Sequence, residues 1–205
     1  AEAEALAIAT ADGEGAEARV RLAVRLERAA LEELAAEEGQ EALEARWDSQ
    51  AERVRCERCL RLGALVVSRT PWPEARGEQV REAMAEGLRQ LGLAALPWCP
   101  RSRGLQQRLA LAHRWLGPPW PDRRLECLEE DPQAWLGEQL SGLRSRQDLR
   151  QINLIEALWG DLSWTDRQQL ERWFPECLAV PSGRQVAIDY SGEEPVLAVK
   201  LQEMF

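Results

Sequence analysis

Apolar and polar residues alternate along the first part of the chain, as they do in strands that bury one face. The clearest run spans residues 19–26, where every second position is apolar: Val20, Leu22, Val24 and Leu26. Arginines occupy the other face, at Arg19, Arg21 and Arg25. This pattern predicts a half-buried strand.

The same alternation predicts four further strands, at residues 6–8, 42–47, 53–60 and 62–68. We expect the first of these to turn back at Asp12-Gly13-Glu14-Gly15. A short helix ended by Gly39 interrupts the series, and its apolar residues are Leu31, Leu34 and Ala35. About five strands with one interposed helix predict a small β-barrel or OB-like sheet over residues 1–70. This segment need not be a complete OB-like domain.

After Pro71-Trp72-Pro73 the apolar spacing becomes helical. A first helix is predicted to stop at Gly92 and a second to run from Ser102, as its N-cap, to Leu116. Further helices are predicted to begin at Asp131-Pro132, to span 149–159, and to begin at a capping box of Thr165 and Gln168 before Pro175. Residues 71–175 are therefore predicted to form a helical domain.

Strand-like alternation returns in residues 176–205. Val186, Ile188 and Tyr190 share one face, and Leu197, Val199 and Leu201 share another, with turns at Ser182-Gly183 and Ser191-Gly192. We expect a β-hairpin segment that is truncated at Phe205. The predicted fold class is α+β, with an OB-like sheet, a central helical bundle and this C-terminal segment.

Charge is segregated along the chain, whose formal net charge is −9. Residues 1–48 carry −8, residues 49–124 carry +7 and residues 125–205 carry −8. A basic middle permits a local phosphate-binding surface on an acidic protein. The candidate nucleic-acid-binding residues are Arg53, Arg55, Arg61, Arg101, Arg103, Arg123 and Arg124. A solvated face balanced by the acidic ends explains the same pattern equally well.

Few residues of the chain suit common enzyme chemistry. Cys56 and Cys59 form its one CxxC, but in a strand this offset sends the thiols to opposite faces, so we expect Cys56 in the core and Cys59 at the surface. His113, the sole histidine, lies among leucines and is interpreted as a helix-surface or partly buried residue. Lys200, the sole lysine, follows no phosphate-binding loop. We therefore expect no catalytic residue, metal site or cofactor here.

Nine tryptophans are a high number for this length, and eight lie in the predicted helical domain. A tryptophan at helical spacing among leucines is usually part of the core. Trp72, Trp98 and Trp120 each adjoin a proline, and we expect these three to be the exposed ones. No apolar run reaches the roughly 18–20 residues that a membrane-spanning helix needs, so we expect no membrane contact and a cytoplasmic location.

Several short segments carry a resemblance to a known family. They are Leu-Gly-Ala-Leu-Val-Val-Ser at 62–68, Leu-Arg-Gln-Leu-Gly-Leu-Ala-Ala-Leu-Pro-Trp at 88–98, Val-Pro-Ser-Gly at 180–183, Asp-Tyr-Ser at 189–191 and Pro-Val-Leu-Ala-Val-Lys-Leu-Gln-Glu-Met-Phe at 195–205. From Leu62 onward the chain resembles the region after the motor core of HrpB-type bacterial ATP-dependent helicases, relatives of the DEAH-box group. Residues 1–61 match more loosely, in pattern rather than in words.

The resemblance implies a parent helicase whose RecA-like core, with its ATP and Mg²⁺, lies elsewhere in the same polypeptide. It implies single-stranded RNA or DNA and that core as partners. The Walker A and Asp-Glu-x-His motifs are absent from this sequence, so no catalytic residue is carried over. Two functions stay open: a non-catalytic accessory region that holds or guides the strand, and a structural, protein-interaction module that braces the core without touching nucleic acid.

Overall fold

The computed structural model describes residues 5–12, 19–200 and 202, which form helices and strands in two compact units. The first unit consists of Ala1–Ala45 and Arg55–Ala75, and the second of Arg46–Val54 and Arg76–Phe205. The mixture of helices and small antiparallel sheets confirms the α+β class. No helix among the described residues is both long and apolar enough to cross a membrane.

The first unit begins with a two-stranded antiparallel sheet of β1 (Ala5–Asp12) and β2 (Arg19–Leu26). The pairing runs from Ala5 opposite Leu26 to Asp12 opposite Arg19, which confirms both predicted strands. The predicted turn after Asp12 lies in residues 13–18, outside the described residues. Val24 is 64% exposed, so the expected burial of its face is wrong at this position.

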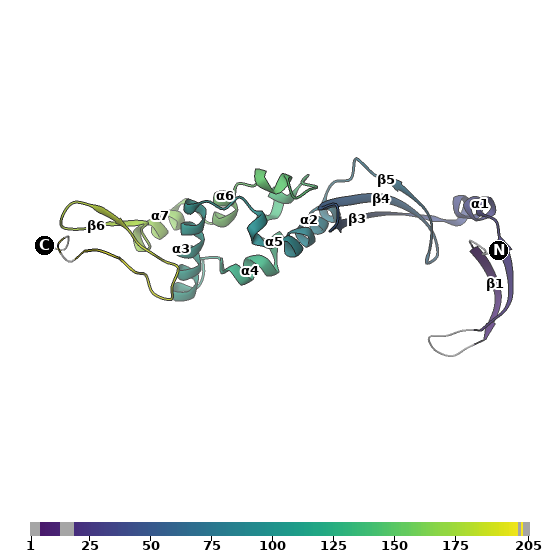
Figure 1. Ribbon diagram of the computed structural model, residues 1–205, viewed down its shortest axis with the longest axis horizontal. Coiled ribbons are helices and arrows are strands. Elements are labelled where there is room, and N and C mark those ends of the chain that lie inside the picture. Colours follow the sequence, from purple (N-terminus) through teal and green to yellow (C-terminus); the bar gives the residue numbers. More distant parts are fainter. Residues whose placement is uncertain (1–4, 13–18, 201, 203–205) are drawn as a thin grey trace. The chain divides into compact units, whose positions relative to one another are not determined.

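Helix α1 (Arg28–Glu38) leads into a three-stranded sheet of β3 (Gln40–Asp48), β4 (Arg53–Leu62) and β5 (Leu65–Pro71), which lie side by side in that order (Figure 1). Gly39 ends α1 where a side chain has no room, since a Cβ there would lie 2.1 Å from the Ala35 carbonyl oxygen. Strand β5 begins at Leu65 rather than at Leu62, because Gly63 adopts a positive φ of 59° and turns the chain.

The strands of the first unit form separate sheets of two and three strands. The described residues do not show these sheets closing into a barrel. An OB-like arrangement of residues 1–70 therefore stays a prediction.

The core of the second unit is built on helices α2 (Glu78–Leu91) and α3 (Pro100–Leu116). Both present apolar residues at helical spacing to the interior, and these are Val80, Met84, Leu88, Leu105, Leu109 and Ala112. Gly92 and Gly117 end the two helices with φ of 74° and 68°, as predicted. The N-cap of α3 is Cys99 and not Ser102 as predicted, because Pro100 occupies the first helical position. Ser102 occupies the third helical position, where its hydroxyl accepts the N–H of Cys99.

The other helical elements of the second unit are shorter than α2 and α3. They are η1 (Leu93–Ala95), α4 (Leu125–Glu130), α5 (Pro132–Leu136), η2 (Gly137–Leu140), η3 (Asp148–Gln151), α6 (Leu154–Trp159) and α7 (Trp164–Trp173). Asp131 caps α5 as predicted, by accepting the Ala134 N–H at 3.1 Å. The predicted helix over 149–159 is divided, because Asn153 caps a new helix after η3. The capping box of α7 is Ser163 with Asp166, two residues before the predicted pair.

The C-terminal segment contains one short hairpin of β6 (Cys177–Ala179) and β7 (Gln185–Ala187), with Gly183 in its turn at a φ of 81°. A single antiparallel bridge then joins Asp189 to Val196. The predicted strand over 197–201 is wrong for residues 197–200, which have no partner strand in the described part of the chain. Leu201 lies outside the described residues.

Candidate nucleic-acid interface

The start of β4 is hydrogen-bonded to residues 144–150 of the second unit, a loop that runs into η3. The Val54 N–H donates to the Arg144 carbonyl at 2.7 Å, and the Arg146 N–H donates to the Glu52 carbonyl at 3.0 Å. Between these bonds Arg53 forms an antiparallel bridge with Ser145. The loop therefore extends the sheet edge at which the exposed Arg53 side chain lies.

Asp148 holds this loop in shape. Its carboxylate accepts the backbone N–H groups of Arg144 and Ser145, both at 2.9 Å. Burial acts to raise the pKa of Asp148, but these N–H donors outweigh burial and the pKa is lowered overall. A fixed negative charge thus organises a loop that is rich in arginine.

The arginines of this loop, Arg144, Arg146 and Arg150, were missed by the charge count because residues 125–205 are acidic as a whole. The signal was local: Arg144-Ser145-Arg146 is followed by Arg150 four residues later. Arg146 pairs with Glu52 at 2.7 Å. Neither Arg53 nor Arg150 has an ion pair within the described part of the chain, so both leave their charge available to a ligand.

Arg101 and Arg103 lie in the first turn of α3, and both are exposed. The guanidinium carbon of Arg103 lies 5.5 Å from the centroid of the Trp98 ring, a cation–π distance. Trp98 is held in turn by its indole N–H, which donates to the Leu93 carbonyl at 2.8 Å. Because backbone N–H groups at a helix N-terminus favour anions, this turn suits a phosphate group.

Arg123 and Arg124 are neighbours with opposite environments. Arg123 is buried, and its Nε–H donates to the Leu158 carbonyl at 3.0 Å. Burial lowers the pKa of Arg123. A buried guanidinium cannot line a surface track, so we remove Arg123 from the candidate contact residues. Arg124 is exposed and forms an ion pair with Asp122 at 2.6 Å, and this hydrogen bond lowers the pKa of Asp122.

Arg55 and Arg61 belong to the first unit and lie on β4. Arg55 is exposed, whereas Arg61 is half-buried and forms an ion pair with Glu44. Glu44 also accepts from Arg69 at 3.2 Å. The charge of Arg61 is therefore balanced within its own unit. The candidate arginines thus form several small groups in two units rather than one continuous set.

A groove of about 660 Å³ in the second unit lies beside α5, α6 and the start of α7. Four carboxylates line it, from Glu138, Glu156, Asp161 and Asp166. The buried Arg123 forms part of its wall, beside Trp159. Glu138 pairs with Arg81 and Glu156 with Arg167, but carboxylates still outnumber guanidinium groups along the lining, so the groove suits phosphate less well than the exposed arginines do.

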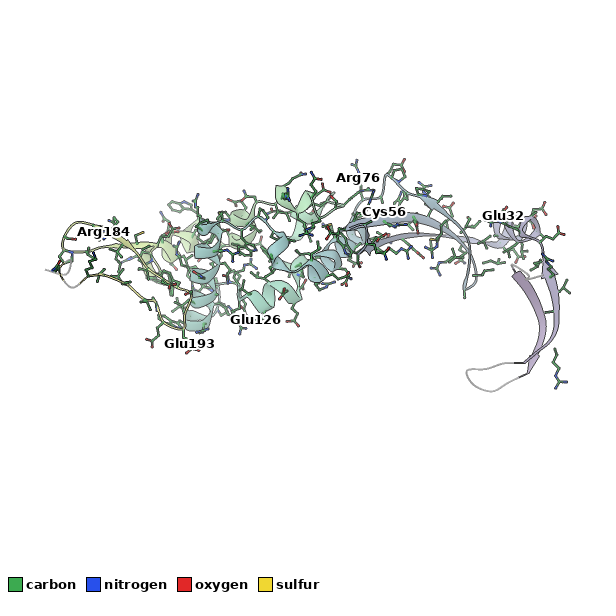
Figure 2. The ribbon with its side chains drawn as sticks, viewed as in Figure 1. Glu32, Cys56, Arg76, Glu126, Arg184 and Glu193 are labelled. Atoms are coloured by element: carbon green, nitrogen blue, oxygen red, sulfur yellow. The ribbon has the colours of Figure 1, made fainter. Side chains whose placement is uncertain are left out.

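The cysteines and the histidine lie in different surroundings: the Cys127 thiol donates to Asp122 at 3.2 Å, and His113 Nε2 lies 3.6 Å from the same carboxylate. Cys59 is fully buried and Cys56, labelled on β4 in Figure 2, is half-buried, the reverse of what the alternation predicts. The reason is that β4 is shared: Val54 faces the core of the second unit, while Cys59 is buried within the first. His113 is half-buried, and its Nδ1 lies 2.8 Å from the Trp120 carbonyl oxygen, as its predicted structural role requires. Within the described residues no group of His, Cys, Asp and Glu could hold a metal ion.

The tryptophans also differ from expectation. Trp120 is only 3% exposed, although it adjoins prolines, because Gly117-Pro118-Pro119 folds it back on the helix that precedes it. Trp72 and Trp98 are half-buried. The exposed rings are Trp115, Trp164 and Trp173. Each of these three residues lies near a helix end, where the spacing of apolar residues does not indicate which side chains are buried.

Comparison with known proteins finds matches to two stretches of the chain. A family model described as "ATP-dependent helicase C-terminal" matches residues 135–205, and one described as "ATP-dependent RNA helicase HrpB, connector region" matches residues 40–72. The ATP-dependent RNA helicase HrpB of Escherichia coli (strain K12) is 33% identical over 161 residues, which make up 78% of this chain and 20% of that protein. The chain thus spans about a fifth of the length of this curated relative.

Two solved structures of the Escherichia coli protein are similar as well. One, titled as a DExH-box NTPase HrpB, is 30% identical with a TM-score of 0.60, over 98% of this chain and 25% of that one. The other, titled as a DEAH/RHA helicase HrpB, is 32% identical with a TM-score of 0.58, over 82% of this chain and 22% of that one. Together these matches show that the chain belongs to the HrpB family and corresponds to its C-terminal region.

Proposed function

We propose that this chain is the non-catalytic C-terminal accessory region of a cytoplasmic, DEAH-box-like helicase, and that it helps to hold the nucleic-acid strand. The RecA-like core of the same polypeptide would bind ATP and Mg²⁺ and move the strand. The relative named ATP-dependent RNA helicase supports RNA as the strand. An OB-like arrangement of residues 1–70 belongs to this proposal too.

One observation carries the proposal: exposed arginines in the second unit gather at two structured places. Arg101 and Arg103 lie at the positive end of α3, and Arg53 lies at the sheet edge with Arg150 in the adjoining loop. Guanidinium groups at such places contact phosphates of any sequence. Binding would then weaken steeply as salt rises, since each phosphate contact releases counterions.

Fluorescence anisotropy tests this with a labelled oligo(rU) of about 12 nucleotides and with oligo(dT) of the same length, titrated between about 25 and 200 mM NaCl. We expect salt-dependent binding that the triple variant Arg53→Glu, Arg101→Glu, Arg103→Glu reduces at least about tenfold. Arg89→Glu is the control, since Arg89 is exposed on α2 and already pairs with Glu86 at 3.0 Å. Equal loss in the control would show a general charge effect instead.

The acidic groove favours a second candidate, a module that braces the helicase core by protein contact. Its carboxylates suit a basic protein surface better than a phosphate backbone. Undetectable binding to either oligonucleotide at about 25 mM NaCl would favour this alternative over strand holding.

The proposal also requires that the isolated chain hydrolyse no ATP. Phosphate release should stay at the level of buffer with and without oligo(rU), because the chain contains no Gly-x-x-x-x-Gly-Lys loop to hold the phosphates. ATP hydrolysis that purifies with the chain would contradict the non-catalytic assignment.

A further inference from the structure

Two exposed tryptophans lie at the C-terminal ends of α3 and α7. Trp115 is 52% exposed and Trp173 is 53% exposed, and Leu116 beside them is 48% exposed. We call these three residues the aromatic patch. The Trp115 ring lies 6.1 Å from that of Phe174, the residue next to Trp173, so the two tryptophans lie near one another in the fold. Neighbouring large apolar groups that stay exposed are typical of a binding surface.

Buried aromatic residues support both tryptophans from beneath. The Trp115 ring lies 6.1 Å from the ring of Phe174, and the Trp173 ring lies 6.4 Å from that of Trp120. Phe174 and Trp120 are only 4% and 3% exposed. Each exposed ring therefore has a buried aromatic neighbour, while about half of the residue's surface stays open to solvent.

Hydrogen bonds fix the supporting residues. The buried Arg108 donates from Nε to the Phe174 carbonyl at 2.6 Å. Phe174 also contacts the Tyr190 ring at 6.3 Å, and the Tyr190 hydroxyl donates to the Pro175 carbonyl at 2.8 Å. The patch is consequently preorganised, which lowers the entropy lost when a ligand binds.

Cations flank the patch. Arg114 and Arg172 directly precede Trp115 and Trp173 and are exposed, and their side chains have no hydrogen bond or ion pair in the part of the chain that the structure describes. The nearby carboxylates of Glu171 and Glu176 are paired with Arg108, at 2.7 and 3.0 Å. Arg108 balances one of these two carboxylates, so Arg114 and Arg172 leave a net positive charge of one among these five groups.

Arg114 also lines a hollow of about 230 Å³ beside the patch. Arg124 and Gln107 line the same hollow, as does Glu126, which Figure 2 labels on α4. Arg124 is paired with Asp122, so Arg114 and the Gln107 amide are the donors in this hollow that carry no such pairing. A phosphate that follows a base stacked on Trp115 would have polar donors here.

We propose that the aromatic patch is a stacking platform for single-stranded nucleic acid, with bases on Trp115 and Trp173 and phosphates at Arg114 and Arg172. This inference rests on the proposed function and adds a contact surface that the candidate arginines do not include. Bases stack on any exposed ring, and paired cations beside rings match the alternation of base and phosphate along a strand. A purely apolar protein partner would not require two unpaired arginines.

Trp164 provides a matched control for exposure. It is 73% exposed on the same helix as Trp173, but nine residues earlier, which places it on the opposite side of α7. A loss of binding on its substitution would reflect general loss of surface tryptophan rather than the platform.

The test measures oligo(rU) binding by anisotropy in the whole chain. We expect Trp115→Ala and Trp173→Ala each to weaken binding about 5- to 100-fold, and Trp164→Ala to leave it unchanged. Trp115→Phe and Trp173→Phe should recover much of the affinity, because a smaller ring still stacks, and they also guard against a folding defect. Arg114→Gln with Arg172→Gln should lower the slope of log affinity against log salt by about 1.4.

Three outcomes are informative. Loss in the platform variants with retention in Trp164→Ala supports the platform. Wild-type affinity in the platform variants, together with loss in the Arg53, Arg101 and Arg103 variant, overturns the platform and leaves the proposed function standing. Absence of binding by the wild-type chain overturns both, and the patch would then be a protein contact.

Discussion

The two units of this chain differ in what holds them together. The second unit has a close-packed interior, in which Met84, Leu109, Leu158 and Leu170 are fully buried. In the first unit the buried side chains, among those the structure describes, are the small residues Ala35, Cys59 and Ala75. Val24, Leu43 and Leu65 are exposed there. The first unit therefore depends more on backbone ladders and ion pairs, and the second on packing.

Amide hydrogen exchange should show the largest contrast between the units. We expect amides of β1 and β2 to exchange at least about 100 times faster than those of α2 and α3, after correction for intrinsic rates, because an isolated two-stranded sheet opens easily. Mass spectrometry of peptides after timed labelling measures this. Similar protection of amides from exchange in both units would mean that the two units do not differ in local stability.

Arg108 offers the next largest effect, and it should be confined to the second unit. The side chain is 1% exposed and joins α3 to the Phe174 carbonyl and to Glu176. Arg108→Met leaves a buried carbonyl without its donor, at a cost of roughly 2–4 kcal/mol of unfolding free energy. The midpoint of thermal unfolding should fall by roughly 5–15 °C in circular dichroism.

The matched control is Arg89→Met, which removes an exposed guanidinium from α2 and should leave the midpoint nearly unchanged. Exchange of β4 and β5 amides should stay as in the wild type for Arg108→Met. Faster exchange of the β4 and β5 amides in this variant would mean that the two units unfold together, and their stabilities would then not be separate.

Packing in the second unit can be tested at one glycine. A Cβ on Gly87 would lie 2.4 Å from two atoms of the Trp47 ring, so α2 needs glycine where the tip of the β3–β4 hairpin packs on it. Gly87→Ala should cost about 1–3 kcal/mol by overpacking. The control Gly104→Ala has nothing within 4 Å and should instead stabilise α3 by about 0.5–1 kcal/mol. Urea unfolding measures both, and the same sign in both would refute the packing argument.

Much of the fold was predictable because it depends on periodicity. Helices α2 and α3 were placed by their buried apolar residues and their closing glycines, and β2 and β3 by alternation. The divisions at Gly137 and Asn153 were not predictable, since a capping side chain or a positive φ decides them while the apolar spacing continues. Burial of Cys59 was not predicted because strand β4 is divided between the two units, with Val54 in the second and Cys59 in the first.

The candidate interface was less predictable than the fold. Arg123 and Arg124 are adjacent and chemically identical, yet one donates to buried carbonyls and the other is exposed beside Asp122. Regional charge counts could not separate them, and they also concealed Arg150 in an acidic third of the sequence. Exposure of Trp115 and Trp173 depends on which residues cover a helix end, and sequence spacing does not carry that information.

The smallest predicted effect concerns acid sensitivity of the first unit. A hydrogen bond from Arg61, assisted by the Cys59 thiol, lowers the pKa of Glu44 in the folded chain below its ordinary value. The stabilisation is therefore present above the unfolded pKa of about 4.3 and is lost as the pH falls through the folded pKa. We expect exchange of β3 and β5 amides to accelerate between about pH 5 and pH 3 relative to intrinsic rates.

Glu44→Gln should flatten this acid response, because the amide cannot titrate, and it should also exchange faster than the wild type near neutral pH. Glu32→Gln is the control, since it alters an exposed carboxylate that pairs with Arg28 on α1 at 2.9 Å, away from the sheet network. An unchanged acid response in Glu44→Gln would mean that the ion pairs around β4 contribute nothing measurable. The first unit would then be held by its backbone ladders alone, which would make the contrast with the packed second unit sharper still.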